Sequence, residues 1–174
     1  LHLCDRRQRQ MCIRDRSEVR VSNDISRKDI GQSLQNILAN KIEEKKQTVS
    51  LIDEKQLNEI LDKIQHAGMV QFVAVGNTIP VALDGAYKLN EIGIPAMAGS
   101  IWETQLSFSM TLKKSDVQIA ISNSGESKQV VKMVRAARKN GATTIGITNN
   151  PNSTIAKEAD YHIQTATRET VSYT

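Results

Sequence analysis

The sequence predicts an α/β fold: a doubly wound, flavodoxin-like sheet of five parallel strands, preceded by two linker helices. From residue 70 onward, short apolar runs alternate with stretches of helical periodicity, and short loops join them. The apolar runs lack the alternation of a half-exposed strand, which indicates strands that helices cover on both faces. We therefore expect a helical linker at residues 17–69 and an α/β domain at residues 70–174.

Residues 1–16 differ from the rest of the chain in composition. They hold five arginines against two aspartates, so they contribute +3 of the net charge of +4, and they contain both cysteines, Cys4 and Cys12. They show neither helical nor strand periodicity, and residues 11–16 resemble a translated sequencing-adapter scar. We expect residues 1–16 to be a non-native segment and exclude them from the fold. A basic arm that binds nucleic acid is the alternative.

Composition also excludes several classes of function. Aromatic residues make up 3% of the chain, so stacking on nucleic-acid bases is not expected. No apolar run approaches the ~20 residues of a membrane span and no signal peptide is visible, which favours a soluble, cytoplasmic protein without a membrane partner. Beyond residues 1–16 there is no cysteine and no Cys/His cluster, so we expect no disulfide and no metal site. The glycine-rich dinucleotide and P-loop motifs are also missing, and we expect no cofactor.

Two helices precede the expected sheet. Apolar residues recur at helical spacing over residues 30–52 and predict one long amphipathic helix, with the charged residues 43–46 on its solvated face. A second helix begins at Asp53, which serves as its N-cap, with Gln56 three residues later in a capping-box arrangement. Gly68 ends this helix.

Strands and helices then alternate. Pro80 falls in the first turn of a helix, where its missing N–H costs nothing, and Ser153 caps a short last helix. His162 is expected to pack inside the fifth strand, and His66 is expected at the surface. The strands are expected at residues 70–75, 95–98, 117–121, 143–148 and 161–165, and the helices from Ile79 to Gly93, at 101–112, between Ser127 and Asn140, and after Ser153.

Two polar turns follow the first and third strands. In the flavodoxin-like order 2-1-3-4-5 these strands are neighbours, and ligands bind beyond their carboxyl ends. The second turn opens a helix, whose unpaired N–H groups and dipole favour an anion, and its serines add hydroxyl donors. This arrangement suits a phosphate monoester, and an ordinary cluster of N-cap residues is the alternative. The predicted site consists of Gly76, Asn77 and Thr78 in the first turn and Ser122, Asn123, Ser124, Gly125 and Ser127 in the second.

From Gln71 to about Glu169 the chain resembles the SIS (sugar isomerase) domain, a phosphosugar-binding fold. The resemblance rests on G-N-T after the first strand, A-Y-K-L-N-E-I-G-I, D-V-Q-I-A-I-S-N-S-G-E-S, G-A-T-T-I-G-I-T-N-N-P-N-S-T-I-A-K-E-A-D and the closing R-E-T. Residues 21–70, with S-L-I-D-E-K-Q-L-N-E-I-L-D-K-I, resemble the connecting helices of RpiR/MurR family transcriptional regulators. In that family an N-terminal helix-turn-helix domain precedes an SIS effector domain.

This resemblance implies roles for the predicted site. It implies that the three serines and Asn123 bind the phosphate of an effector, that the first turn lines the sugar side, and that Glu169 contacts the ligand or has a structural role. Ile79 and Pro80 depart from the small residues that the family more often has there. The resemblance also implies a homodimer or homotetramer that contacts DNA only through the helix-turn-helix domain. Because that domain and the usual C-terminal helix are missing, we expect a fragment truncated at both ends.

The residues favour a sensor over an enzyme. Aldose–ketose isomerisation needs a general base and a general acid near C1 and C2 of the substrate. SIS isomerases carry a histidine-bearing acidic stretch after the second strand, whereas residues 99–105 hold no histidine. Glu103 is better explained as a first-turn acid favoured by the helix dipole, so we assign no catalytic residue. We expect a non-catalytic sensor of a sugar phosphate; the alternatives are a sugar-phosphate isomerase, with Glu103 or Glu169 as the base, and a stand-alone phosphosugar-binding subunit.

Overall fold

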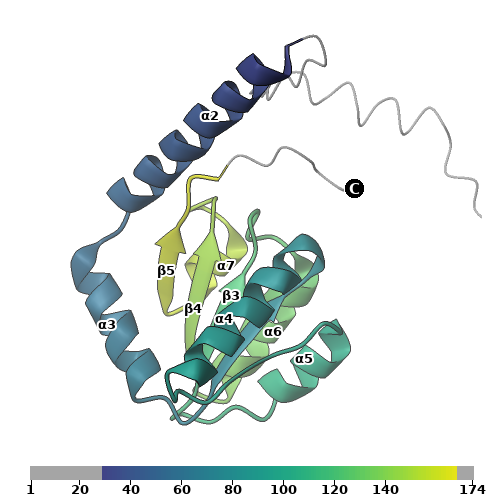
Figure 1. Cartoon of the computed structure of the whole chain (residues 1–174). Coiled ribbons are helices and arrows are strands. Elements are labelled where there is room, and N and C mark those ends of the chain that lie inside the picture. The colour runs from purple at the N-terminus through teal and green to yellow at the C-terminus, as the bar shows by residue number, and fades with distance from the viewer. Residues whose placement is uncertain (1–28, 168–174) are drawn as a thin grey trace, which may run out of the picture. The chain divides into compact units, whose positions relative to one another are not determined.

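The computed structural model describes residues 29–167 and contains a five-stranded sheet in the order β2-β1-β3-β4-β5 (Figure 1). Every pairing between neighbouring strands of this sheet is parallel. The order is the flavodoxin-like order 2-1-3-4-5 that the sequence predicts, so the expected fold class is confirmed. The strands are β1 (Val70–Ala74), β2 (Ala96–Ala98), β3 (Val117–Ile121), β4 (Thr143–Thr148) and β5 (Tyr161–Gln164).

The chain forms two compact units. One spans residues 44–167 and holds the whole sheet; of the other, residues 29–43 are described. No helix in the described part of the chain is long and apolar enough to cross a membrane. The helices are α2 (Ile30–Ser50), α3 (Glu54–Gln65), α4 (Ile79–Glu91), α5 (Trp102–Ser109), α6 (Lys128–Lys139) and α7 (Thr154–Glu158), with a short 3-10 turn η1 (Gly76–Thr78).

The two helices before the sheet form where the sequence predicts them. Asp29 Oδ1 accepts the backbone N–H of Gln32 at 2.9 Å in the first turn of α2. Asp53 is the N-cap of α3, and its Oδ1 accepts the N–H of Gln56 at 2.9 Å. The side chain of Gln56 accepts the N–H of His162 in the edge strand β5 at 3.0 Å. Gln56 therefore ties α3 to β5, beside which α3 lies in Figure 1.

Helices cover both faces of the sheet, as the strands without polar alternation indicate. Successive residues of a strand point to opposite faces, so Phe72 and Val73 of β1 belong to different hydrophobic clusters. Phe72 packs in one cluster with residues of α3 and α4, and Val73 packs in another with residues of α5, α6 and α7. The first cluster includes Ile60, Ala82, Ala86 and Ile119, and the second includes Leu106, Val130, Val134 and Ile155.

One helix is shorter than the sequence predicts. Helix α5 ends at Ser109, whereas the apolar pattern extends the helix to Leu112. The N–H of Thr111 donates to Phe108 O at 2.9 Å, three residues back, which tightens the chain after α5. Leu112 then enters a small buried cluster with Ala137 and is 7% exposed. The pattern was apolar up to Leu112 because this residue packs into the core from a loop.

A row of polar side chains crosses the sheet on the side of α5 and α6. Gln71 of β1, Gln118 of β3 and Thr144 of β4 stand opposite one another in the strand register, and each is at most 1% exposed. Gln105 of α5 joins this row: its Oε1 accepts the N–H of Ala74 and its Nε2 donates to Ala74 O, both at 2.9 Å. These two bonds fix α5 to the last residue of β1, next to the first polar turn.

Candidate functional site

The two polar turns lie side by side at the carboxyl ends of β1 and β3, which pair along their whole length. Thr78 connects the turns, because its Oγ1 donates to Val75 O at 2.9 Å and also lies 3.4 Å from Ile121 O, at the end of β3. Gly76 has a φ of +61°, a backbone conformation that favours glycine. The structure thus brings Gly76, Asn77 and Thr78 next to the second polar turn, residues 122–127, which we call the serine loop.

Hydrogen bonds inside the serine loop give its serines different roles. Ser122 is 3% exposed; its Oγ accepts the N–H of Gly125 at 3.2 Å and lies 3.1 Å from Ser127 Oγ. Ser124 is exposed, and its Oγ accepts the N–H of Glu126 at 3.2 Å. Ser122 therefore supports the loop from inside, whereas the hydroxyls of Ser124 and the half-buried Ser127 are nearer to solvent.

The serine loop ends at the N-terminus of α6. Ser127 is the N-cap residue of this helix, yet within the described part of the chain its hydroxyl makes no capping hydrogen bond to the first turn. Ser153 does cap α7, where its Oγ accepts the N–H of Ala156 at 3.3 Å. Because the Ser127 side chain does not serve as a cap, the first-turn N–H groups of α6 and the positive end of its dipole suit an anion.

Asn123 links the serine loop to the segment after β5. Its backbone oxygen accepts the N–H of Asn149 at 2.9 Å, and its Oδ1 accepts a hydrogen bond from Thr167 Oγ1 at 2.8 Å. One residue earlier, the N–H of Ala166 donates to Thr48 Oγ1 in α2 at 3.0 Å. The chain that leaves β5 therefore touches both the predicted site and the last turns of α2.

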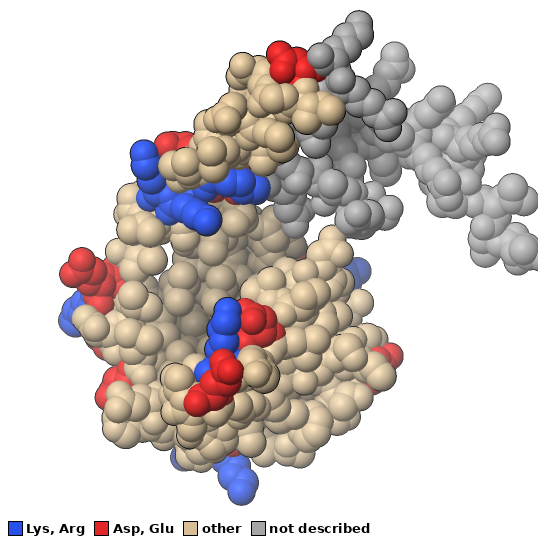
Figure 2. Space-filling model, in the orientation of Figure 1, with Lys and Arg blue, Asp and Glu red and all other residues tan. Residues whose placement is uncertain are grey.

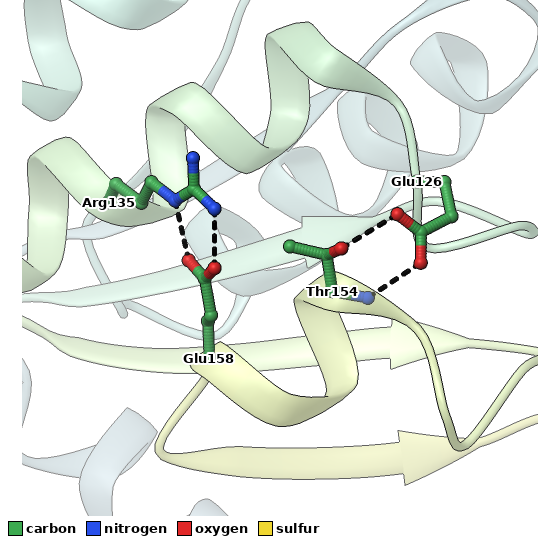
Figure 3. A network of polar contacts seen from close by, with 4 residues as sticks. All are labelled: Glu126, Arg135, Thr154 and Glu158. Carbon is green, nitrogen blue, oxygen red and sulfur yellow. Dashed lines mark hydrogen bonds and ion pairs between the residues drawn. The ribbon is translucent and has the colours of Figure 1, made fainter.

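A contact that the sequence did not indicate joins the serine loop to α7 (Figure 3). Glu126 Oε1 accepts the N–H of Thr154 at 2.8 Å, and Glu126 Oε2 accepts the Thr154 hydroxyl hydrogen at 2.7 Å. Both bonds lower the pKa of Glu126 from its ordinary value, and the bond from the Thr154 hydroxyl has the larger effect. Glu126 and Thr154 are 28 residues apart, so no local capping pattern reveals their pairing.

A second carboxylate holds the other end of α7. Arg135 of α6 donates through Nε to Glu158 Oε2 at 2.7 Å and through Nη2 to Glu158 Oε1, and Figure 3 shows the two side chains facing one another. This two-bond ion pair lowers the pKa of Glu158 and raises the pKa of Arg135. Helix α7 is therefore tied to the serine loop at its start and to α6 at its end.

The residues considered as acids or bases lie in separate places. Glu103 is in the first turn of α5, as predicted, and is exposed. His66 is exposed at the end of α3, with Nδ1 3.3 Å from Asp62 Oδ1. His162 lies in β5, half-buried, with Nε2 2.8 Å from Thr148 Oγ1, and burial lowers its pKa. Glu169 lies outside the described residues. Among the described residues, no group of three or more His, Cys, Asp or Glu side chains is placed to hold a metal ion.

The charged side chains on one face of the molecule are distributed unevenly (Figure 2). Lysine and arginine atoms gather over the last turns of α2, where Lys45 and Lys46 are exposed. Over α3 and α4, acidic and basic atoms are interspersed. Pairs such as Lys88 Nζ and Asp84 Oδ2, 2.7 Å apart on α4, explain this mixture as an ordinary solvated helix surface.

Solved structures of other proteins share this fold. Vibrio vulnificus NanR complexed with ManNAc-6P matches with a TM-score of 0.75 at 22% identity, over 80% of this chain and 53% of that one, so the chain spans about half of the NanR length. The sugar isomerase domain of an RpiR transcription factor from Sphaerobacter thermophilus matches with a TM-score of 0.74 at 24% identity, over 79% of this chain and 77% of that one.

One of the similar solved structures is named as an enzyme. A putative sugar-phosphate isomerase from Listeria monocytogenes matches with a TM-score of 0.57 at 28% identity, over 72% of this chain and 70% of that one. The RpiR transcription factor and the isomerase thus share one fold, which by itself does not decide between their activities. The model of the SIS domain family matches residues 63–174, more than half of the sequence, and the chain therefore belongs to the SIS domain family.

Proposed function

We propose that this chain is the effector domain of a transcriptional regulator and binds a sugar phosphate at the serine loop. In this proposal Asn123, Ser124 and Ser127 contact the phosphate, Ser122 and Gly125 shape the loop that presents them, and Gly76, Asn77 and Thr78 line the sugar side. Residues 17–69 serve as linker helices, residues 70–174 as the effector domain, and Glu169 as a contact to the ligand. Residues 1–16 have no part in this function.

The observation that carries the proposal is the absence of a side-chain cap at the N-terminus of α6 among the described residues. Ser127 occupies the N-cap position without a capping bond among the described residues, and the adjoining Ser124 presents an exposed hydroxyl. A phosphate group needs several donors at once, and here hydroxyls, backbone N–H groups and a helix dipole meet at one strand end. The neighbouring turn at Gly76–Thr78 offers polar groups at the distance of one strand spacing, about 5 Å.

A regulatory role is supported by the relatives and by the linker contact. The RpiR protein is named as a transcription factor, and the NanR structure holds ManNAc-6P. In this chain, the segment that touches Asn123 also donates a hydrogen bond to α2. A ligand that binds two arrangements of the protein with different affinity shifts the balance between them. We propose that this balance, in a homodimer or homotetramer, controls a helix-turn-helix domain of the full-length protein.

An aldose–ketose isomerase is the second candidate, and the Listeria monocytogenes neighbour favours it. Such an enzyme needs a base beside the sugar carbons. Glu103 and Glu169 are the carboxylates available for that role. Glu103 stands in the first turn of α5, where the helix dipole already accounts for an acidic residue.

Titration calorimetry tests the proposed function directly. The purified chain is titrated with inorganic phosphate and with a panel of pentose and hexose phosphates that includes ManNAc-6P. We expect one or more sugar phosphates to bind, and Ser124→Ala and Ser127→Ala each to weaken binding by about 1–3 kcal/mol. Unchanged affinity in both variants would place the phosphate elsewhere. Conversion of a bound sugar phosphate into its aldose or ketose isomer would contradict the sensor proposal and support the isomerase.

A further inference from the structure

The Glu126 side chain faces Thr154 at the start of α7 (Figure 3). Its two carboxylate oxygens accept one hydrogen bond each from Thr154, at 2.8 Å from the N–H and at 2.7 Å from the hydroxyl. Bidentate bonds to a charged carboxylate fix both its position and its direction. The carboxylate of Glu126 in the serine loop is therefore bound by Thr154, 28 residues further along the same chain.

Two further contacts dock the serine loop on the same end of α7. Gly125 O accepts the N–H of Ile155 at 3.1 Å. A Cβ on Gly125 would lie 2.1 Å from Ser153 Oγ, which shows how closely the loop backbone approaches the α7 N-cap. Ser153 is itself fully buried and cannot move aside without disturbing α7. The loop and α7 therefore pack tightly against one another, and the Glu126 carboxylate adds hydrogen bonds between them.

The opposite end of α7 completes a closed set of contacts. Helix α6 follows the serine loop directly, and its Arg135 binds Glu158 at the end of α7. The loop, α6 and α7 are thus linked in a ring, with Glu126–Thr154 at one junction and Arg135–Glu158 at the other. Of the two junctions only Glu126–Thr154 holds the loop itself, because the Arg135 junction does not touch the loop; the Gly125 contact to Ile155 acts at the same end of α7.

Because Glu126 is negatively charged, an effect on loop geometry can be told apart from a direct electrostatic effect on the ligand. A carboxylate two residues from Ser124 and one from Ser127 repels a phosphate dianion, so its removal alone would tighten binding. Loss of loop geometry acts in the opposite direction, because donors that are not held in place must be ordered when the ligand binds. The two effects of removing Glu126 therefore have opposite signs.

We propose that Glu126 is a positioning residue of the serine loop, which holds the phosphate donors in their binding arrangement through Thr154 and does not contact the ligand. This inference rests on the proposed sugar-phosphate function. It assigns Thr154, and through it the start of α7, to the support of the site. It also gives Glu126 a purpose despite the unfavourable charge that it brings to an anion site.

The test compares four variants of the full chain in titrations with inorganic phosphate and the sugar phosphate that binds best. We expect Glu126→Ala to weaken binding about three- to tenfold, although it removes a negative charge, and Thr154→Val to weaken it by a smaller factor with the charge unchanged. Glu158→Ala removes the same charge and the other contact of α7, so it is the matched control and should stay within about twofold. The double variant Glu126→Ala/Thr154→Val should be no weaker than Glu126→Ala alone, since the two side chains act through each other.

Tighter or equal binding by Glu126→Ala overturns the proposal. Ser127→Ala, titrated alongside, separates this failure from a failure of the proposed function: if Ser127→Ala loses affinity and Glu126→Ala does not, only the positioning role is wrong. If neither loses affinity, or if no phosphate compound binds, the serine loop is not the phosphate site. In every case amide hydrogen exchange without ligand measures the positioning itself. Exchange at residues 123–127 should rise in Glu126→Ala and stay unchanged in Glu158→Ala, and equal exchange in both contradicts the proposal.

Discussion

Gln71 and Gln118 stand opposite one another on the central strands β1 and β3, and Gln118 Nε2 donates to Gln71 Oε1 at 3.0 Å in the buried interior. Ser109 of α5 completes the arrangement, because its Oγ donates to Gln71 Oε1 at 3.0 Å and accepts from Gln118 Nε2 at 2.9 Å. Gln118 Oε1 is buried without a hydrogen-bond partner, the one such side-chain atom among the described residues. The two glutamines are thus unequal: both polar side-chain atoms of Gln71 have hydrogen-bond partners, whereas only Nε2 of Gln118 has them.

This inequality predicts different costs for the same substitution. Gln71→Met removes three hydrogen bonds, including the one from Gln71 Nε2 to Gln105 O, and should lower the free energy of unfolding by about 2–3 kcal/mol. Gln118→Met also removes the unsatisfied oxygen, so its cost should stay below about 1.5 kcal/mol. Urea unfolding followed by circular dichroism measures both values. Equal costs would show that the unpaired oxygen carries no penalty.

Replacement of Gly125 should be much more damaging than replacement of a comparable glycine. Gly93 and Gly125 both have positive φ, +83° and +68°, but a Cβ on Gly93 meets nothing within 4 Å. Gly93→Ala should therefore cost only the left-handed backbone strain, roughly 1–2 kcal/mol. Gly125→Ala adds a clash with the buried Ser153 and should cost more and abolish sugar-phosphate binding. Similar unfolding free energies for the two variants would contradict the close packing of the loop on α7.

The stability of the fold should depend on pH through His162. Burial lowers its pKa from the ordinary value of 6.5, so the neutral ring is preferred in the folded state. The stability linked to this preference is fully present above pH 6.5 and is lost as the pH falls through the lower folded pKa. We expect the free energy of unfolding to fall as the pH drops below 6.5, above the titration of most carboxylates. The variant His162→Gln, whose amide can still donate to Thr148, should show a flatter profile; an unchanged slope would assign the pH effect to another group.

The sequence predicted the fold well because its signals are local. Apolar strands, helical stripes and caps such as Asp53 are patterns of neighbouring residues, and the alternation of elements predicted a parallel doubly wound sheet, for which the flavodoxin-like strand order is a common arrangement. The meeting of the two polar turns followed from that order. What each loop residue does was not predictable, because the decisive contacts join distant residues: Ser122 is buried under its own loop, and Glu126 binds Thr154 in another helix.

Polar residues in the core were also missed, for a related reason. Gln118 stands inside the apolar run of β3, where the sequence pattern assigns it no partner. Its partners Gln71 and Ser109 are 47 and 9 residues away, so only the folded chain shows that they satisfy one another. Buried amides of this kind are stable only as a set, and a single sequence does not show which residues form the set.

The hydrogen bond between Ala166 and Thr48 connects the end of α2 to the proposed ligand site, so a probe on α2 should report whether a ligand is bound. Ala166 adjoins Thr167, which binds Asn123, so a ligand that changes the contact between Asn123 and Thr167 alters the surroundings of the last turns of α2. A fluorophore on Val49→Cys, a position 68% exposed, should change its emission when a sugar phosphate binds, in a background where Cys4 and Cys12 are serine. Thr48→Val should mute this optical signal while leaving affinity within about twofold. An undiminished signal would mean that α2 reads the site by another route.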